Sequence, residues 1–88
     1  MTLKEFIDAL NAKFEKDGYK FTTMAGPKYV RVVKNSRGQE SVFCFVDYAG
    51  NIYKSAGWKS PVKQVRSTLA TVDIDKVDAY GGWLYAGR

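Results

Sequence analysis

Residues 40–56, ESVFCFVDYAGNIYKSA, decide the fold. Side chains of a strand alternate between two faces, and here apolar residues occupy both: Val42, Cys44 and Val46 on one, Phe43 and Phe45 on the other. This pattern predicts a central strand. The following Ala-Gly-Asn has the composition of a turn and leads into a second apolar stretch, so we expect an antiparallel connection here.

The residues before this stretch extend the same sheet. Residues 19–24 alternate with a period of two, Gly26-Pro27 interrupts them, and KYVRVVK at 28–34 resumes as a strand before the turn NSRG at 35–38. Residues 19–56 are therefore predicted to form an antiparallel meander of three or four strands.

A helix is predicted at the start of the chain, within residues 1–18. Thr2 and Glu5 have the spacing of a capping box, in which each side chain binds the backbone amide of the other residue. Asp17-Gly18 is a typical left-handed stop. Apolar residues at steps of three and four form one stripe between these ends: Leu3, Phe6, Ile7, Leu10 and Phe14.

A second helix is predicted over residues 60–72. Ser60 is a favourable N-cap, and Pro61 fits the first helical position. Val62, Val65, Leu69 and Val72 repeat at steps of three and four. The fold class expected from these elements is a single α+β domain with the order helix, three-stranded antiparallel sheet, helix.

Residues 73–88 form an aromatic C-terminal segment with too many glycines for a helix. Two alternatives stay open: a short final strand, or a tail held by Trp83 and Tyr85. Asp73, Asp75 and Asp78 lack the glycine and distal glutamate of a calcium-binding loop, so we interpret them as a solvated turn.

Composition excludes several kinds of chemistry. The chain has no histidine, which is the most frequent general base near neutral pH and the commonest transition-metal ligand. The single cysteine, Cys44, lies in an apolar run and can form no internal disulfide. No base stands beside a nucleophile, so we predict a protein that is not an enzyme, holds no metal and needs no cofactor.

The predicted location follows from hydropathy. No apolar run approaches the length of a membrane span, and Lys4, Glu5 and Asp8 interrupt the region where a signal peptide would be apolar. We expect a cytoplasmic protein without a membrane partner.

Positive charge is concentrated in the middle of the 88-residue chain. The formal net charge is +5, and residues 19–72 contain nine basic and two acidic residues, a net charge of +7. A surface of this kind attracts phosphates. The candidate nucleic-acid or anion-binding residues are Lys54, Lys59, Lys63, Arg66, Lys28 and Arg31, with Trp58 and Tyr53 as candidate rings for base stacking. The alternative is that Trp58 anchors the core while its neighbours are simply solvated.

One segment resembles a family of small, mostly uncharacterised proteins of tailed bacteriophages. FVDYAGNIYKSAGWKSPVKQVR, residues 45–66, matches the recurring F-V-D, G-x-I/V-Y-K and W-K-x-P-x-K-x-x-R elements of those proteins. The matching residues are Phe45, Val46, Asp47, Gly50, Tyr53, Lys54, Trp58, Lys59, Pro61, Lys63 and Arg66. The resemblance implies a phage product made in the bacterial cytoplasm and implies no particular activity.

The predicted order of elements also resembles the double-stranded-RNA-binding domain. Residues 26–29, Gly-Pro-Lys-Tyr, stand where that family has a Gly-Pro-containing loop, and Lys59 and Lys63 bracket the start of the predicted second helix. In that family clustered lysines at this helix reach phosphates across a groove. The adjacent lysine pair of the family is absent, because Ser60-Pro61 stands between the two lysines.

These observations predict a small non-enzymatic binding protein whose partner is nucleic acid, DNA or RNA. Two alternatives remain open at this stage. The protein could instead be a phage accessory protein that docks on an acidic host protein, or a minor component of the virion or its assembly.

Overall fold

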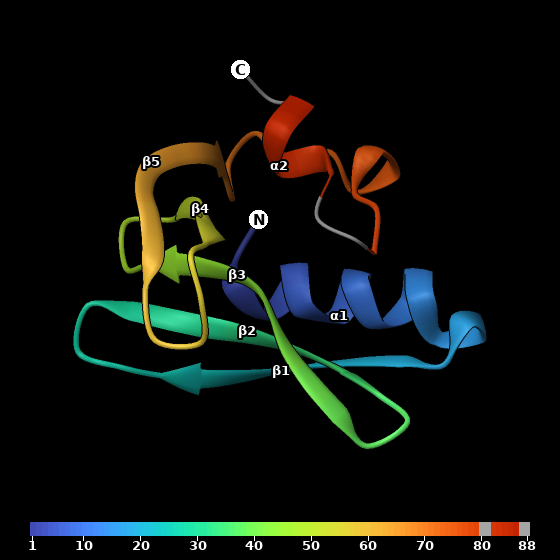
Figure 1. Cartoon of the computed structure of the whole chain (residues 1–88). Coiled ribbons are helices and arrows are strands. Elements are labelled where there is room, and N and C mark those ends of the chain that lie inside the picture. The colour runs from blue at the N-terminus through green and yellow to red at the C-terminus, as the bar shows by residue number, and fades with distance from the viewer. Residues whose placement is uncertain (80–81, 87–88) are drawn as a thin grey trace.

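The computed structural model describes residues 1–79 and 82–86. One helix of three turns and a short C-terminal segment lie against a five-stranded antiparallel sheet (Figure 1). The strands are adjacent in the sheet in their chain order, so the sheet is a simple meander. The elements are α1 (Leu3–Phe14), η1 (Glu15–Asp17), β1 (Tyr19–Ala25), β2 (Tyr29–Ser36), β3 (Gln39–Asp47), β4 (Asn51–Ser55), β5 (Pro61–Thr68), η2 (Ile74–Lys76) and α2 (Trp83–Ala86).

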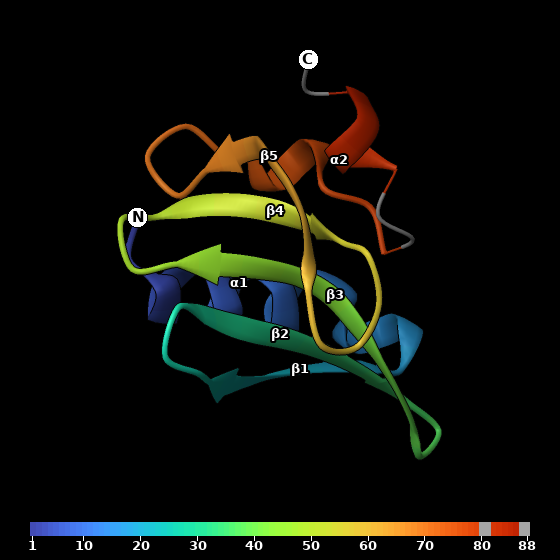
Figure 2. The same cartoon turned by 60° about the vertical axis from the view of Figure 1, so that its left-hand side comes forward.

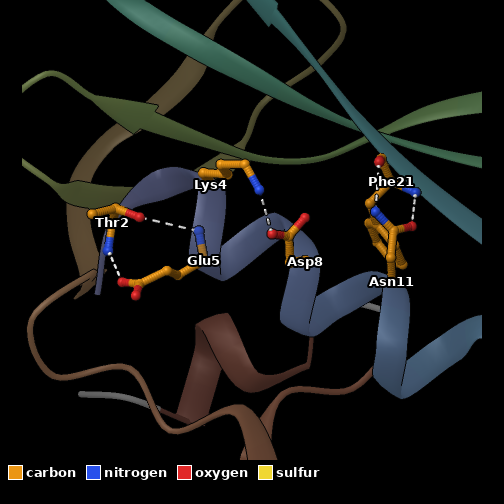
Figure 3. A network of polar contacts seen from close by, with 6 residues as sticks. All are labelled: Thr2, Lys4, Glu5, Asp8, Asn11 and Phe21. Atoms are coloured by element: carbon orange, nitrogen blue, oxygen red, sulfur yellow. Dashed lines mark hydrogen bonds and ion pairs between the residues drawn. The ribbon is translucent and has the colours of Figure 1, made fainter.

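The first helix begins as the sequence predicts. Thr2 Oγ1 accepts a hydrogen bond from the Glu5 amide at 3.1 Å, and Glu5 Oε1 accepts one from the Thr2 amide at 2.8 Å (Figure 3). Phe6, Leu10 and Phe14 are buried on the face that meets the sheet. Gly18 ends the helical region with a φ of 80°, which is accessible to glycine without strain.

A β-bulge separates two neighbouring aromatic residues of β3. Val32 of β2 pairs with Cys44, whereas Val33 pairs with Val42, so Phe43 is an extra residue in β3. Phe43 joins the core under α1, together with Cys44. The prediction that Phe43 and Phe45 share a face is therefore wrong, because the bulge interrupts the two-residue alternation between them.

Residues 60–72 do not form the predicted second helix. Residues 61–68 are strand β5, which pairs with β4 through Ser55–Pro61, Tyr53–Val65 and Ile52–Ser67. The pairing contains two register shifts, and Val65, which the helix prediction placed on a buried stripe with Val62, is 46% exposed. The segment is rich in β-branched residues, and proline is tolerated as the first residue of an edge strand.

The correct architecture is thus one long helix and five strands, and the order helix, three strands, helix is wrong. The resemblance to the double-stranded-RNA-binding domain depended on that order, and the element that would present Lys59 and Lys63 at a helix start is a loop followed by a strand.

The C-terminal segment covers the core rather than extending the sheet. Trp83 stacks against Phe43, with ring centroids 5.8 Å apart, and Leu84 is buried beside it. Lys13 Nζ donates to the carbonyl oxygens of Ile74 and Val77, both at 2.6 Å. Of the two predicted alternatives, residues 73–79 and 82–86 match the tail anchored by Trp83, while the side chain of Tyr85 lies outside the described part. The expectation that glycines exclude a helix from this segment is wrong, because η2 and the four-residue helix α2 lie between the glycines and the turns.

Candidate functional site

The loop between β4 and β5 folds over the face of the sheet opposite α1. Figure 2 shows this connection passing in front of β3 toward β2, with α1 behind the sheet. Arg31 of β2 holds the loop: its Nε donates to the Trp58 carbonyl at 2.6 Å, and its guanidinium lies 5.0 Å from the Trp58 ring. The same guanidinium lies 5.7 Å from the ring of Phe45. Arg31 therefore links the loop to the two central strands.

A pocket of about 280 Å³ opens beside this contact. Residues from the end of β1, the β1–β2 connection, β2, β3 and the β4–β5 loop contribute to it. We call it the basic pocket, because three of its lining residues are cationic. The lining residues are Met24, Ala25, Gly26, Pro27, Lys28, Tyr29, Arg31, Phe45 and Lys59.

The cations of the basic pocket have no carboxylate partner within the described part of the chain. Lys28 and Lys59 are exposed, and neither forms an ion pair with a residue in 1–79 or 82–86. Arg31 binds a carbonyl oxygen and two rings, none of which neutralises its charge. Like charges that gather without neutralisation attract anions.

Asp47 is the acidic group on the same face of the sheet, opposite Tyr29 in the β2–β3 pairing. Its carboxylate accepts hydrogen bonds from the amides of Ala49 and Asn51, from the Asn51 side chain and from Tyr53 Oη. Burial raises the pKa of Asp47, but these hydrogen bonds outweigh burial and hold the pKa below its ordinary value. Asp47 thus fixes the β3–β4 turn, because both of its carboxylate oxygens accept hydrogen bonds from residues of that turn and of β4.

Two exposed apolar side chains lie at or next to the basic pocket. Met24 lines it and is 47% exposed, and Trp58, which contacts Arg31, is 41% exposed. Tyr48 is 64% exposed and does not line this pocket: it lines a second pocket together with Val30 and Val46, and its hydroxyl donates to the Gly26 carbonyl at 2.6 Å. Sequence reasoning missed Met24; the one signal pointing to it is its position beside the turn Gly26-Pro27.

The structure brings together three of the six predicted basic residues: Lys28, Arg31 and Lys59. Lys54 and Lys63 lie in β4 and β5 and do not line the pocket. Arg66 is half-buried and donates to the Leu84 carbonyl at 3.3 Å, so it belongs to the contact between β5 and the C-terminal segment.

The two predicted stacking rings differ in their environment. Trp58 is exposed at the pocket, whereas Tyr53 is half-buried, with its hydroxyl bound to Asp47 and its ring 5.4 Å from the ring of Tyr29. Tyr53 is therefore a structural residue.

Two other polar groups that the structure describes are enclosed in the core or bonded within a turn. Cys44 is buried, and burial raises the pKa of its thiol far above neutrality. No cluster of acidic and cysteine side chains suited to a metal ion occurs among residues 1–79 and 82–86. Asp73 accepts a hydrogen bond from the Asp75 amide, as in an ordinary turn. No helix of this part is long and apolar enough to cross a membrane.

Comparison with known proteins identifies the family without indicating an activity. A model described as a family of unknown function, DUF7717, matches residues 2–86. The chain belongs to this family. No curated protein and no solved structure matches it. For this member of DUF7717, the basic pocket is thus the feature from which a function can be argued.

Proposed function

We propose that this DUF7717 protein is a non-enzymatic nucleic-acid-binding protein that uses the basic pocket to hold phosphates. One observation supports the proposal above the others: Lys28, Arg31 and Lys59 come from three separate segments and line one pocket, with no carboxylate pairing with them in the described residues. Each lysine or arginine that neutralises a phosphate releases counterions, so such a surface gains affinity as the salt concentration falls.

The net charge of +5 adds a general attraction to this local one. Phe45, Trp58 and Lys59, which contact Arg31 or line the pocket, also belong to the segment that resembles phage proteins. A phage product that binds nucleic acid would act in the cytoplasm of the bacterial host, and we include that location in the proposal.

The test is fluorescence anisotropy with labelled DNA and RNA across a salt series. Wild type is compared with Lys28→Ala/Lys59→Ala and with the charge-matched control Lys16→Ala/Lys76→Ala, whose lysines are exposed and lie outside the basic pocket. Loss of two phosphate contacts should reduce the slope of log K against log salt by about 1.4 to 1.8. The control should retain the wild-type slope.

Equal losses in the two double variants would contradict the proposal, because they would show attraction by net charge alone. Absence of binding near physiological salt would also contradict it and would favour an acidic protein as the partner. Thermal unfolding of each variant shows whether the fold is intact.

A further inference from the structure

Arg31 uses little of its hydrogen-bonding capacity within the protein. A guanidinium group carries five N–H donors. Nε of Arg31 donates to the Trp58 carbonyl at 2.6 Å, and Nη1 lies 3.8 Å from the sulfur of Met24, which is a weak acceptor. No oxygen atom of residues 1–79 or 82–86 accepts from the other N–H groups. Most donors of Arg31 are therefore available to a ligand in the basic pocket, which Arg31 lines.

The guanidinium group is also held in place before a ligand binds. Its bond to the Trp58 carbonyl fixes one edge, and the rings of Trp58 and Phe45 lie 5.0 and 5.7 Å away. The side chain of Arg31 is half-buried. Two N–H groups of a guanidinium match two oxygens of a phosphate, and a side chain that is already ordered loses less conformational entropy on binding. Arg31 is thus suited to bidentate binding of a phosphate.

Apolar walls strengthen the attraction between the basic pocket and an anion. Met24, Pro27 and Phe45 line the pocket, and Phe45 is only 3% exposed. A cleft that combines charges of one sign with walls of low dielectric focuses the electric field into the cleft. The lining includes three cationic residues and no acidic one. The pocket therefore favours a ligand group that carries more than one negative charge.

The end of a nucleic-acid strand can provide such a group. A phosphate monoester at a strand end carries a charge of about −1.5 to −2 at pH 7 and offers three free oxygens. An internal phosphodiester carries a single negative charge and is joined to the chain on both sides. At about 280 Å³ the pocket is just below the usual range for small-molecule sites, so it suits one compact group. A group that is attached to the chain on one side only can enter such a pocket.

We infer that the basic pocket receives the terminal phosphate of a nucleic-acid strand, which Arg31 binds with two N–H groups while Lys28 and Lys59 neutralise the remaining charge. This inference rests on the proposed function and names the part of the nucleic acid that the site recognises. Arg31 determines the specificity, whereas the two lysines attract any phosphate. Terminal phosphates occur at 5′ and 3′ ends of DNA and RNA, and separate probes distinguish these sources.

The experiment compares single-stranded oligonucleotides of one sequence, labelled at an internal base and prepared as DNA and as RNA. One probe has hydroxyl groups at both ends, and two others have a 5′-phosphate or a 3′-phosphate. A fourth has hydroxyl ends and is one nucleotide longer, so it also carries an additional phosphate. Fluorescence anisotropy should show that a phosphate-ended probe binds about 10-fold more tightly than the longer hydroxyl-ended probe, the effect of one additional charge-assisted hydrogen bond.

Two arginine variants test whether Arg31 causes this preference. Arg31→Lys keeps the positive charge and removes the paired N–H groups, so the preference should fall to about two-fold or less. The salt slope with the hydroxyl-ended probe should stay as in wild type. Arg37→Lys makes the same change at an exposed position in the β2–β3 turn, outside the pocket, and should keep the wild-type preference. A general loss of structure would weaken binding of all probes alike, whereas loss of the bidentate contact changes their ratio.

Inorganic phosphate provides a test that needs no variant. It should abolish the preference of wild type for the phosphate-ended probe, because it occupies the same pocket. Sodium chloride at equal ionic strength should leave the preference in place. This measurement keeps the inference open to refutation if Arg31→Lys does not fold.

Equal affinity for the phosphate-ended and the longer hydroxyl-ended probes, together with a reduced salt slope in Lys28→Ala/Lys59→Ala, would overturn this inference and leave the proposed function intact. A preference that persists in folded Arg31→Lys, or in the presence of inorganic phosphate, would overturn it in the same way. Absence of binding to every probe would overturn both.

Discussion

The side chain of Asn11 binds Phe21 as a neighbouring strand would. Its Nδ2 donates to the Phe21 carbonyl at 3.0 Å, and its Oδ1 accepts from the Phe21 amide at 2.8 Å (Figure 3). Phe21 is at the middle of β1, an edge strand of the sheet, so these backbone groups face away from β2. The carboxamide of Asn11 thus attaches α1 to the sheet and occupies part of an edge that could otherwise pair with another chain.

Asn11→Ala should destabilise the fold and promote self-association. Two hydrogen bonds are lost, worth about 1 to 3 kcal/mol together in the free energy of unfolding. The exposed backbone of β1 then becomes available to a second chain. Urea denaturation measures the first effect, and sedimentation velocity over a range of concentrations measures the second. Lys20→Ala, an exposed change in the same strand, is the control; identical behaviour of the two variants would contradict the proposed role of Asn11.

Asp47→Asn should destabilise the β3–β4 turn by about 1 to 2 kcal/mol at pH 7, because an amide cannot accept all four hydrogen bonds. The pKa of Asp47 is lower in the folded state than its ordinary value near 3.9. The ionised carboxylate therefore contributes its full stabilisation of the fold above that ordinary value. This stabilisation is lost as the pH falls through the folded-state pKa.

The difference in unfolding free energy between wild type and Asp47→Asn should therefore shrink between about pH 4 and pH 2. Denaturant titrations at several pH values measure it. Glu40→Gln, an exposed carboxylate-to-amide change in the same strand, should show little difference at either pH. A difference for Asp47→Asn that stays constant down to pH 2 would exclude the proposed linkage.

Lys13→Met should loosen the C-terminal segment. The ammonium group of Lys13 binds the Ile74 and Val77 carbonyls, and Lys34 supports the same segment through the Ala79 carbonyl at 2.7 Å. Methionine keeps much of the apolar stem and removes both charged hydrogen bonds, which are worth about 3 to 6 kcal/mol in total. Limited proteolysis with mass spectrometry should show faster cleavage after residue 70. Lys16→Met, at an exposed position, should be cleaved as wild type is.

The sequence predicts the first helix and the central meander well because their signals are local. The Thr2–Glu5 capping box, the apolar stripe of α1 and the turn residues each depend on a few neighbouring positions. The pattern of residues 60–72 predicts a helix wrongly, because Ser60-Pro61 and the valine spacing fit a helix start and the pairing of β5 with β4 leaves no regular two-residue alternation. A valine repeat at three residues does not distinguish a bulged strand from a helix turn.

The site was predicted only in part for a similar reason. Lys28, Arg31 and Lys59 meet because the β4–β5 loop folds back onto β2, and no local pattern encodes that approach. Arg66 is predicted as a basic-site residue because a helix over residues 60–72 would place it on the same face as Lys63. In the structure it contacts Leu84 instead.

The two tryptophans should respond in opposite ways to truncation. Trp83 is 9% exposed and lies between Phe43 and Phe6, with ring centroids 5.8 and 6.4 Å away, so Trp83→Ala should cost about 3 to 5 kcal/mol of stability. Trp58 is 41% exposed and loses mainly its contact with Arg31, so Trp58→Ala should cost about 1 kcal/mol or less. Guanidinium denaturation of both variants measures the difference.

A loss of 3 kcal/mol or more in Trp58→Ala would place that ring in the core and would remove it from the candidate binding surface. A small loss leaves a large, exposed aromatic side chain that contributes little to stability. That outcome is expected if Trp58, which Arg31 holds through its carbonyl and its ring, belongs to the proposed binding surface.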